Sequence, residues 1–258
     1  STEEFIELVN VVSSEPMDWF FEQWVYGVGH PIFEVDGAYN PSKRMYTLKV
    51  KQNQRVDSII GKRKIPYFKG KVIVEVDDVL KVIQLEAKKE NTYEFSIPGP
   101  PKIVNFDYKD AWIKESTFEK STDLLIQELN SQDALHRVSV MQQLTNITLN
   151  QNTSGAIKTK IKLELQKKAL DEEYWRMRLI AVSQLAQLYP VNNQGEIELD
   201  VEMEKVLLSL VKREKSWVKA WTINFLGNTR DKKYVPLYLE GLTDYSDRVV
   251  FMSAIALG

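Results

Sequence analysis

The strongest constraint on the fold is a helical pattern that recurs through the C-terminal half of the sequence. Four segments align, at residues 137–144, 178–185, 219–226 and 250–257, and each ends in Leu. These leucines, Leu144, Leu185, Leu226 and Leu257, are separated by 41, 41 and 31 residues. Another Leu- and Val-rich stretch precedes each segment, at 124–129, 161–170, 206–211 and 237–242. Because an isolated pair of such helices cannot bury its apolar face, the spacing predicts helix pairs that stack on one another.

We therefore predict a HEAT/armadillo-like α-α superhelix over residues 112–258. Most of the aromatic residues that its helices carry are expected to fill the seams between helix pairs. They are Tyr174, Trp175, Trp217 and Trp221. Arrays of this kind end in a cap with a polar outer face. Since the last segment stops at Gly258, within a repeat, we expect the domain to be truncated at its C-terminus.

Residues 31–111 show a different period, in which apolar and polar side chains alternate. The pattern predicts six strands, at residues 32–35, 46–52, 72–76, 82–85, 93–97 and 103–106. Turn signals such as Asp36-Gly37 and Pro98-Gly99 separate them. The adjacent acids Asp77-Asp78 are also expected to form a turn rather than a sugar or metal site. No helical period intervenes, so we predict a small antiparallel β-sandwich.

Residues 1–30 are expected to form two helices. The first carries an apolar stripe over residues 5–12, and the second, for which Ser14 is the expected N-cap, carries an aromatic face. That face consists of Met17, Phe20, Phe21 and Trp24. Because the segment offers no partner for this face, we expect it to bury against another surface.

Residues that carry enzyme chemistry are scarce. The sequence has no Cys and two His, His30 and His136, which stand 106 residues apart. This excludes Cys-ligated metal sites and a cysteine nucleophile. It also excludes the His-Glu-x-x-His pattern of zinc peptidases, in which two imidazoles one helical turn apart meet one ion. We predict no catalytic residue, no metal ligand and no cofactor in this chain.

The charge balance excludes other partners. Lys and Arg number 34 and Asp and Glu 36, so no global positive field exists for nucleic acid or anionic lipid. The one basic stretch, residues 61–64, is expected to be a solvated loop. Apolar runs are too short for a membrane span, and no signal peptide is visible. We favour a cytoplasmic location, although a periplasmic or secreted one is compatible with an N-terminus that lies outside the sequence.

One position of the repeat is basic in three successive segments, as Arg137, Arg178 and Lys219. Such a series typically pairs with acids near the preceding turn, but it can also line a concave binding face. These residues are our candidates for a binding surface.

The segment over residues 20–31 resembles a known family. It reads Phe-Phe-Glu-Gln-Trp-Val-Tyr-Gly-Val-Gly-His-Pro. It is similar to the end of the catalytic domain of M1 zinc aminopeptidases, where a Phe-x-x-Trp helix runs into a Gly-x-Pro turn and a strand. In that family a β-sandwich and a helical superhelix follow, in the order that the three periods predict here.

The resemblance implies a non-catalytic C-terminal fragment of an aminopeptidase (a metallopeptidase, hence a hydrolase). Residues 1–30 would then be the last helices of a missing catalytic domain, which would hold the zinc and bind their aromatic face. The sandwich would act as a spacer, and the superhelix would restrict access to the N-termini of peptide substrates. An exposed apolar face also implies a tendency to self-associate.

Two alternatives stay open. The chain can belong to an M1-like or HEAT-repeat scaffold that has lost zinc and serves protein–protein assembly. It can also be a free-standing helical-repeat binding module, in which case residues 5–26 should pack within the chain.

Overall fold

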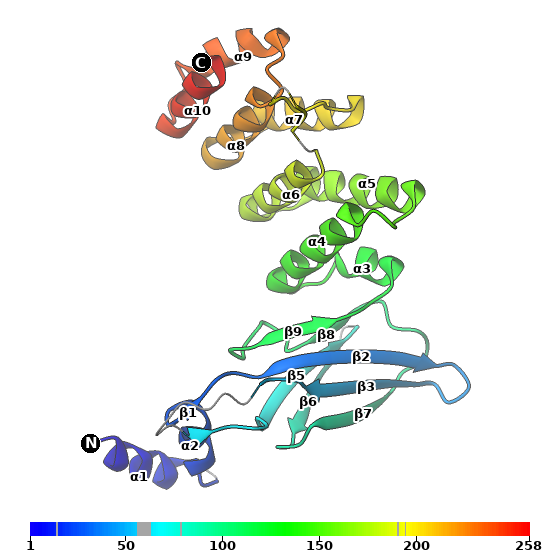
Figure 1. Ribbon diagram of the computed structural model, residues 1–258, viewed down its shortest axis with the longest axis vertical. Helices are drawn as coiled ribbons and strands as arrows, with labels where there is room; N and C mark the ends of the chain where they lie inside the picture. Colours follow the sequence, from blue (N-terminus) through cyan, green and yellow to red (C-terminus); the bar gives the residue numbers. More distant parts are fainter. Residues whose placement is uncertain (14, 56–62, 78, 190, 194) are drawn as a thin grey trace. The chain divides into compact units, whose positions relative to one another are not determined.

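The computed structural model describes residues 1–13, 15–55, 63–77, 79–189, 191–193 and 195–258. The chain divides into two compact units, Ser1–Leu124 and Leu125–Gly258 (Figure 1). The first contains the β-sheets and the second is helical, which confirms the predicted order of fold types. The finer boundaries at residues 30/31 and 111/112 stay predictions. Ser14, Asp78 and residues 61–62, on which a helix cap, a turn and a basic loop were predicted, lie outside the described residues.

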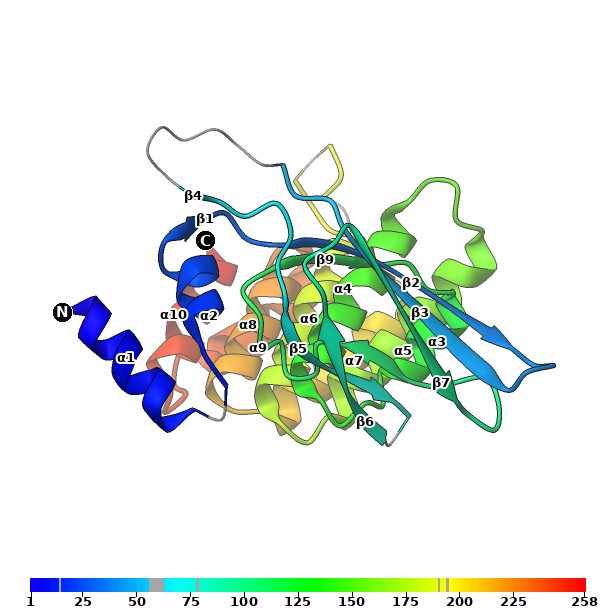
Figure 2. The same cartoon turned by 90° about the horizontal axis from the view of Figure 1, so that it is seen from below.

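Two sheets of the first unit pack face to face. One contains β2 (Ile32–Asn40), β3 (Met45–Gln52), β7 (Glu90–Ser96) and β9 (Glu115–Phe118) in the order β7-β3-β2-β9. The other contains β5 (Gly70–Val76), β6 (Val79–Leu85) and β8 (Val104–Phe106) in the order β6-β5-β8. Figure 2 shows β2, β3 and β7 side by side, as their antiparallel pairing requires. Alternate residues such as Val35, Leu48 and Val74 point between the sheets and form one apolar core.

All six predicted strands are present, and β9 is an addition. This strand runs parallel to β2, with Ile32 beside Glu115 and Val35 beside Phe118. A short parallel pair, β1 (Gly27–Val28) and β4 (Arg63–Lys64), lies outside the two sheets.

Two helices precede the sheets. The first, α1 (Thr2–Val12), begins with a capping box in which Ser1 and Glu4 exchange hydrogen bonds. The second, α2 (Asp18–Trp24), is short because its C-cap, Val25, stands only two residues before β1 begins at Gly27.

The second unit consists of helices packed in sequence. They are α3 (Thr122–Glu128, which begins in the first unit), α4 (Ala134–Leu149), α5 (Gly155–Asp171), α6 (Trp175–Gln187), α7 (Val201–Arg213), α8 (Ser216–Gly227), the 3-10 turn η1 (Lys232–Tyr234), α9 (Val235–Gly241) and α10 (Asp247–Leu257). Helix α6 contacts both α4 and α8, and α8 contacts α10, so these helices form one layer (Figure 1). Contacts of α5 with α7 begin a second layer.

The recurring leucines mark the core of this unit. Leu144, Leu185 and Leu226 are fully buried, whereas Leu257, in the last turn of α10, is 37% exposed. No described helix is both long and apolar enough to cross a membrane.

We predict that Gly241→Ala destabilises the helical unit by about 1–3 kcal/mol. A Cβ at Gly241 would overlap the side chain of Ser253 where α9 crosses α10. The measurement is urea unfolding followed by circular dichroism at the helix signal. Gly155→Ala is the matched control, because a Cβ there meets nothing within 4 Å; equal losses in both variants would contradict the prediction.

Candidate functional site

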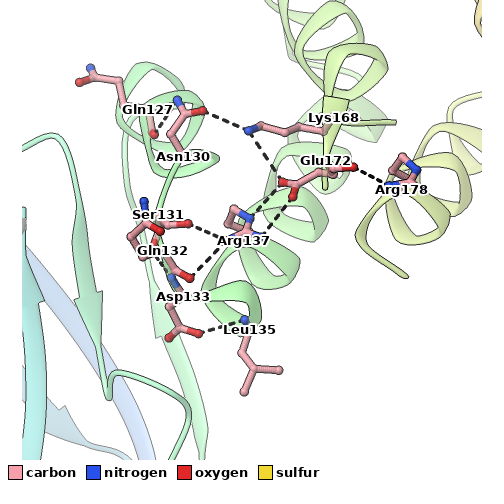
Figure 3. A network of polar contacts seen from close by, with 10 residues as sticks. All are labelled: Gln127, Asn130, Ser131, Gln132, Asp133, Leu135, Arg137, Lys168, Glu172 and Arg178. Atoms are coloured by element: carbon pink, nitrogen blue, oxygen red, sulfur yellow. Dashed lines mark hydrogen bonds and ion pairs between the residues drawn. The ribbon is translucent and has the colours of Figure 1, made fainter. Parts of the chain in front are cut away.

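The first basic residue of the repeat, Arg137 on α4, is held by two turns. Its Nε and Nη2 lie 3.0 and 3.1 Å from the two carboxylate oxygens of Glu172, at the end of α5. Its Nη1 donates to the carbonyls of Ser131 (2.7 Å) and Gln132 (3.4 Å), in the turn before α4 (Figure 3). The side chains of Arg137 and Glu172 are only 15% and 8% exposed. This is a bidentate ion pair with little access to solvent.

The second basic residue repeats this geometry one helix pair further on. Arg178 on α6 donates from Nη1 to the carbonyls of Glu172 (2.6 Å) and Glu173 (2.8 Å). Its Nη2 donates to Glu214 Oε2 at 2.8 Å, at the end of α7. Its Nε lies 2.7 Å from Glu214 Oε1 but its N–H points elsewhere, so this contact is an ion pair without a hydrogen bond.

The third basic residue, Lys219 on α8, makes a simpler contact. Its Nζ lies 2.7 Å from Asp244 Oδ2, in the turn between α9 and α10, and Asp244 also accepts a hydrogen bond from the backbone N–H of Ser246. Burial by itself would raise the pKa of Asp244, but the hydrogen bonds from Lys219 and Ser246 and the charge of Lys219 outweigh it and lower that pKa.

We call these three contacts (Arg137–Glu172, Arg178–Glu214 and Lys219–Asp244) the charge ladder. The helix pairs of the repeat are α3/α4, α5/α6, α7/α8 and α9/α10. Each acid of the ladder belongs to the pair that follows its cation, which corrects the expectation of acids near the preceding turn. For the two arginines, the preceding turn supplies backbone carbonyls instead. The stacking of successive pairs is the reason, because it brings the next turn beside each cation. A role of the three cations in ligand binding stays a prediction, and the observed contacts are internal.

The aromatic residues of the repeats lie elsewhere than predicted. Trp175 packs partly against the helical core, but Tyr174, Trp217 and Trp221 are 51%, 42% and 42% exposed. The expectation that most of these residues fill the seams is therefore wrong, since three of the four are exposed. The two tryptophans of α8 are four residues apart, so they share one face, and that face is turned to solvent.

The four residues of the aromatic face predicted on the second helix differ in their burial. Trp24 packs on Phe68, with ring centroids 5.0 Å apart, and on Trp112 at 5.6 Å. Phe21 is buried and contacts Phe5 of α1 at 5.9 Å, whereas Phe20 is 39% exposed. Met17 is half-buried and precedes α2 as its N-cap residue.

A residue that was not singled out from the sequence, Gln23, fixes α2 to the sheets. Its side-chain amide donates to the carbonyl of Lys69 (3.1 Å) and accepts from the N–H of Lys69 (2.8 Å). An aromatic groove of about 330 Å³ lies alongside. Its lining consists of Trp19, Phe20, Trp24, Lys69, Gly70, Lys71, Ala111, Trp112 and Ile113.

The histidines make separate contacts. His30 Nε2 lies 2.8 Å from Glu115, and His136 Nε2 lies 3.2 Å from the buried Glu128. Among the described residues, no group of three or more His, Cys, Asp or Glu side chains is placed to hold a metal ion.

Comparison with known proteins gives a likeness of fold. No family model and no curated protein sequence matches the chain. Among solved structures, aminopeptidase A of Legionella pneumophila, in complex with aspartic acid, is similar with a TM-score of 0.68 at 14% identity. The match covers 100% of this chain and 35% of that one, so the chain spans about a third of the enzyme's length. The fold is thus shared with part of an aminopeptidase.

We predict that Glu214→Gln lowers the free energy of unfolding of the helical unit by about 3 kcal/mol, because it leaves the buried Arg178 charge without its partner. Urea unfolding measures the loss. Glu202→Gln is the control, since Glu202 and Lys205 form an ion pair with side chains 63% and 66% exposed and its loss should cost under about 0.5 kcal/mol. Similar losses at the two sites would refute a stabilising ladder.

We also predict that the contribution of Asp244 depends on pH. Its pKa is lower in the folded chain than the ordinary value of 3.8. The carboxylate therefore stabilises the fold fully above that value, and the contribution is lost as the pH falls through the lower folded-state pKa. The difference in unfolding free energy between the natural chain and Asp244→Asn should be constant above about pH 5 and shrink as the pH falls below about 5. Asp171→Asn, at the exposed end of α5, is the control; a difference for Asp244→Asn that does not change on acidification would contradict the assignment.

Proposed function

We propose that the chain is the non-catalytic C-terminal region of an M1-type zinc aminopeptidase. The observation that carries the proposal is the likeness of the whole chain to about a third of an aminopeptidase. The segment over residues 20–31, which resembles the end of the M1 catalytic domain, supports it independently. In this proposal the zinc and the catalytic residues belong to an upstream domain, and the chain itself is inactive.

The α2 region supports a contact with that upstream domain. Phe20 is exposed and borders the aromatic groove, whereas Gln23 and Trp24 anchor α2 to the sheets. On α1 the apolar residues Leu8, Val11 and Val12 are 59%, 81% and 76% exposed. An apolar surface of this kind is typical of an interface. The upstream domain in cis is the proposed partner, and self-association of the isolated chain through the same surface is part of the proposal.

The helical unit is proposed to be a HEAT-like superhelix that walls off the catalytic centre. Paired helices that contact their neighbours along the chain support this assignment. The charge ladder ties each helix pair to the next, as a wall of fixed shape requires. Such a wall would admit peptide N-termini and exclude large substrates.

We predict that the complete protein binds zinc and hydrolyses aminoacyl-anilides, and that residues 1–258 alone do neither. The measurements are metal analysis and release of the aniline. The sequence encoded before Ser1 should contain His-Glu-x-x-His and a following Glu, and replacing that motif's first Glu by Gln should abolish hydrolysis while zinc stays bound.

A complete protein without this motif, or with it but without zinc and hydrolysis, would contradict the peptidase assignment. The first of these outcomes favours the scaffold alternative. In a free-standing module residues 5–26 should pack within the chain. Helix α2 does so, but α1 has no buried residue. The exposure of α1 therefore favours the proposal of an upstream catalytic domain over the free-standing module.

A further inference from the structure

A second surface of the helical unit has the features of a ligand site. A cavity of about 410 Å³ lies where α6 and α8 begin. Its lining consists of Trp175, Arg178, Arg213, Glu214, Lys215, Ser216 and Trp217. Ligand pockets measure about 300–1,000 Å³. The cavity can therefore admit a side chain or a short segment of a partner.

The lining carries an excess of positive charge. Arg178 and Arg213 both contact the carboxylate of Glu214, which neutralises one of them. Lys215 is exposed, and within the part of the chain that the structure describes it has no ion-pair partner. Three cations and one acid thus leave two positive charges around the cavity.

Each aromatic wall of the cavity carries a further guanidinium. Arg248 of α10 lies over the Trp217 ring, 4.2 Å from its centroid, and Arg176 lies 5.4 Å from the centroid of the Trp175 ring. Neither arginine has an acidic partner among the described residues. Stacking on an indole holds a guanidinium in place and leaves its N–H groups at the edge free to bind a carboxylate.

Exposed apolar side chains lie further along α8 and on α10, which contacts α8. Trp221 follows Trp217 on one face of α8 and is 42% exposed. On the neighbouring α10, Phe251 and Ile255 are 61% and 51% exposed and also share a face. A partner that contacts the cations would also meet apolar side chains here.

We propose that this surface, formed by the cavity with Arg176, Trp221, Arg248 and Phe251, binds an acidic peptide segment that also carries apolar side chains. Charge complementarity is the reason, since the cations of this surface outnumber its one acid, Glu214, and stand beside aromatic rings. The chain as a whole has a net charge of −2, so it lacks the extended positive field that nucleic acids require. This inference does not depend on the peptidase assignment.

The test measures binding of a fluorescein-labelled dodecapeptide of Asp, Glu and Leu to the full chain by fluorescence anisotropy. The control peptide has Asn and Gln in place of Asp and Glu. We expect the acidic peptide to bind at least about tenfold more tightly, and more weakly as salt rises from about 50 to about 300 mM.

The variant Lys215→Gln/Arg248→Gln should weaken binding of the acidic peptide by about tenfold, since each exposed charge contributes modestly. Both positions are exposed, so an unchanged thermal unfolding curve is expected and verifies folding. Lys158→Gln, near the start of α5, removes a charge at a distance from the cavity and should change affinity less than about twofold.

Three results would overturn the proposal. One is equal affinity for the acidic and amide peptides, or no binding of either at millimolar concentration. Another is a loss in Lys158→Gln as large as that in the double variant. The third is displacement of the peptide by a single-stranded DNA of equal length at similar affinity, which would assign the surface to polyanions in general.

Discussion

The helical unit depends on the buried contacts between a cation on one helix pair and an acid on the next. A guanidinium removed from water must be paired and hydrogen-bonded, or its burial is costly. Arg137 and Arg178 meet this condition only when two turns are in place. The turn before the helix of each arginine supplies backbone carbonyls, and the turn of the next helix pair supplies a carboxylate. The contacts therefore fix how far apart successive pairs stand. Lys219–Asp244 preserves the arrangement although the interval of the repeat shortens, because α9 has 7 residues where α7 has 13.

The same reasoning divides the N-terminal helices into a fixed part and a free part. Gln23 satisfies both polar atoms of its amide on the backbone of Lys69, and Trp24 packs between Phe68 and Trp112. Helix α2 thus belongs to the sheet-containing unit. Of the predicted aromatic face, Phe20 is exposed and Met17 is half-buried, so the proposed interface combines these residues with the outer face of α1.

The alternation of apolar residues and the recurrence of leucines predicted the parts of the fold in which apolar side chains are buried. Alternating apolar residues located six strands, and the recurring leucines located the helical core. Strand β9 could not be found in this way, because Glu-Ser-Thr-Phe carries no apolar alternation and pairs through its backbone. Recurrence also identified the cations of the ladder but not their acids. Glu172 stands beside Glu173, and only the folded turns determine which carboxylate reaches Arg137.

The ladder also explains why the surface that we propose for peptide binding lies beside the three cations that the sequence suggested for this role. Residues two positions apart on a helix point to nearly opposite sides. When Arg178 and Lys219 turn into the seam between helix pairs, Arg176 and Trp217 must turn outward. At the corresponding place of α10, Arg248 is exposed and stacks on Trp217. The repeat that directs Arg137, Arg178 and Lys219 into structural pairs therefore directs the residues two positions earlier toward solvent. Two residues at this outward position, Arg176 and Arg248, are cations, and the described residues provide no acidic partner for either of them.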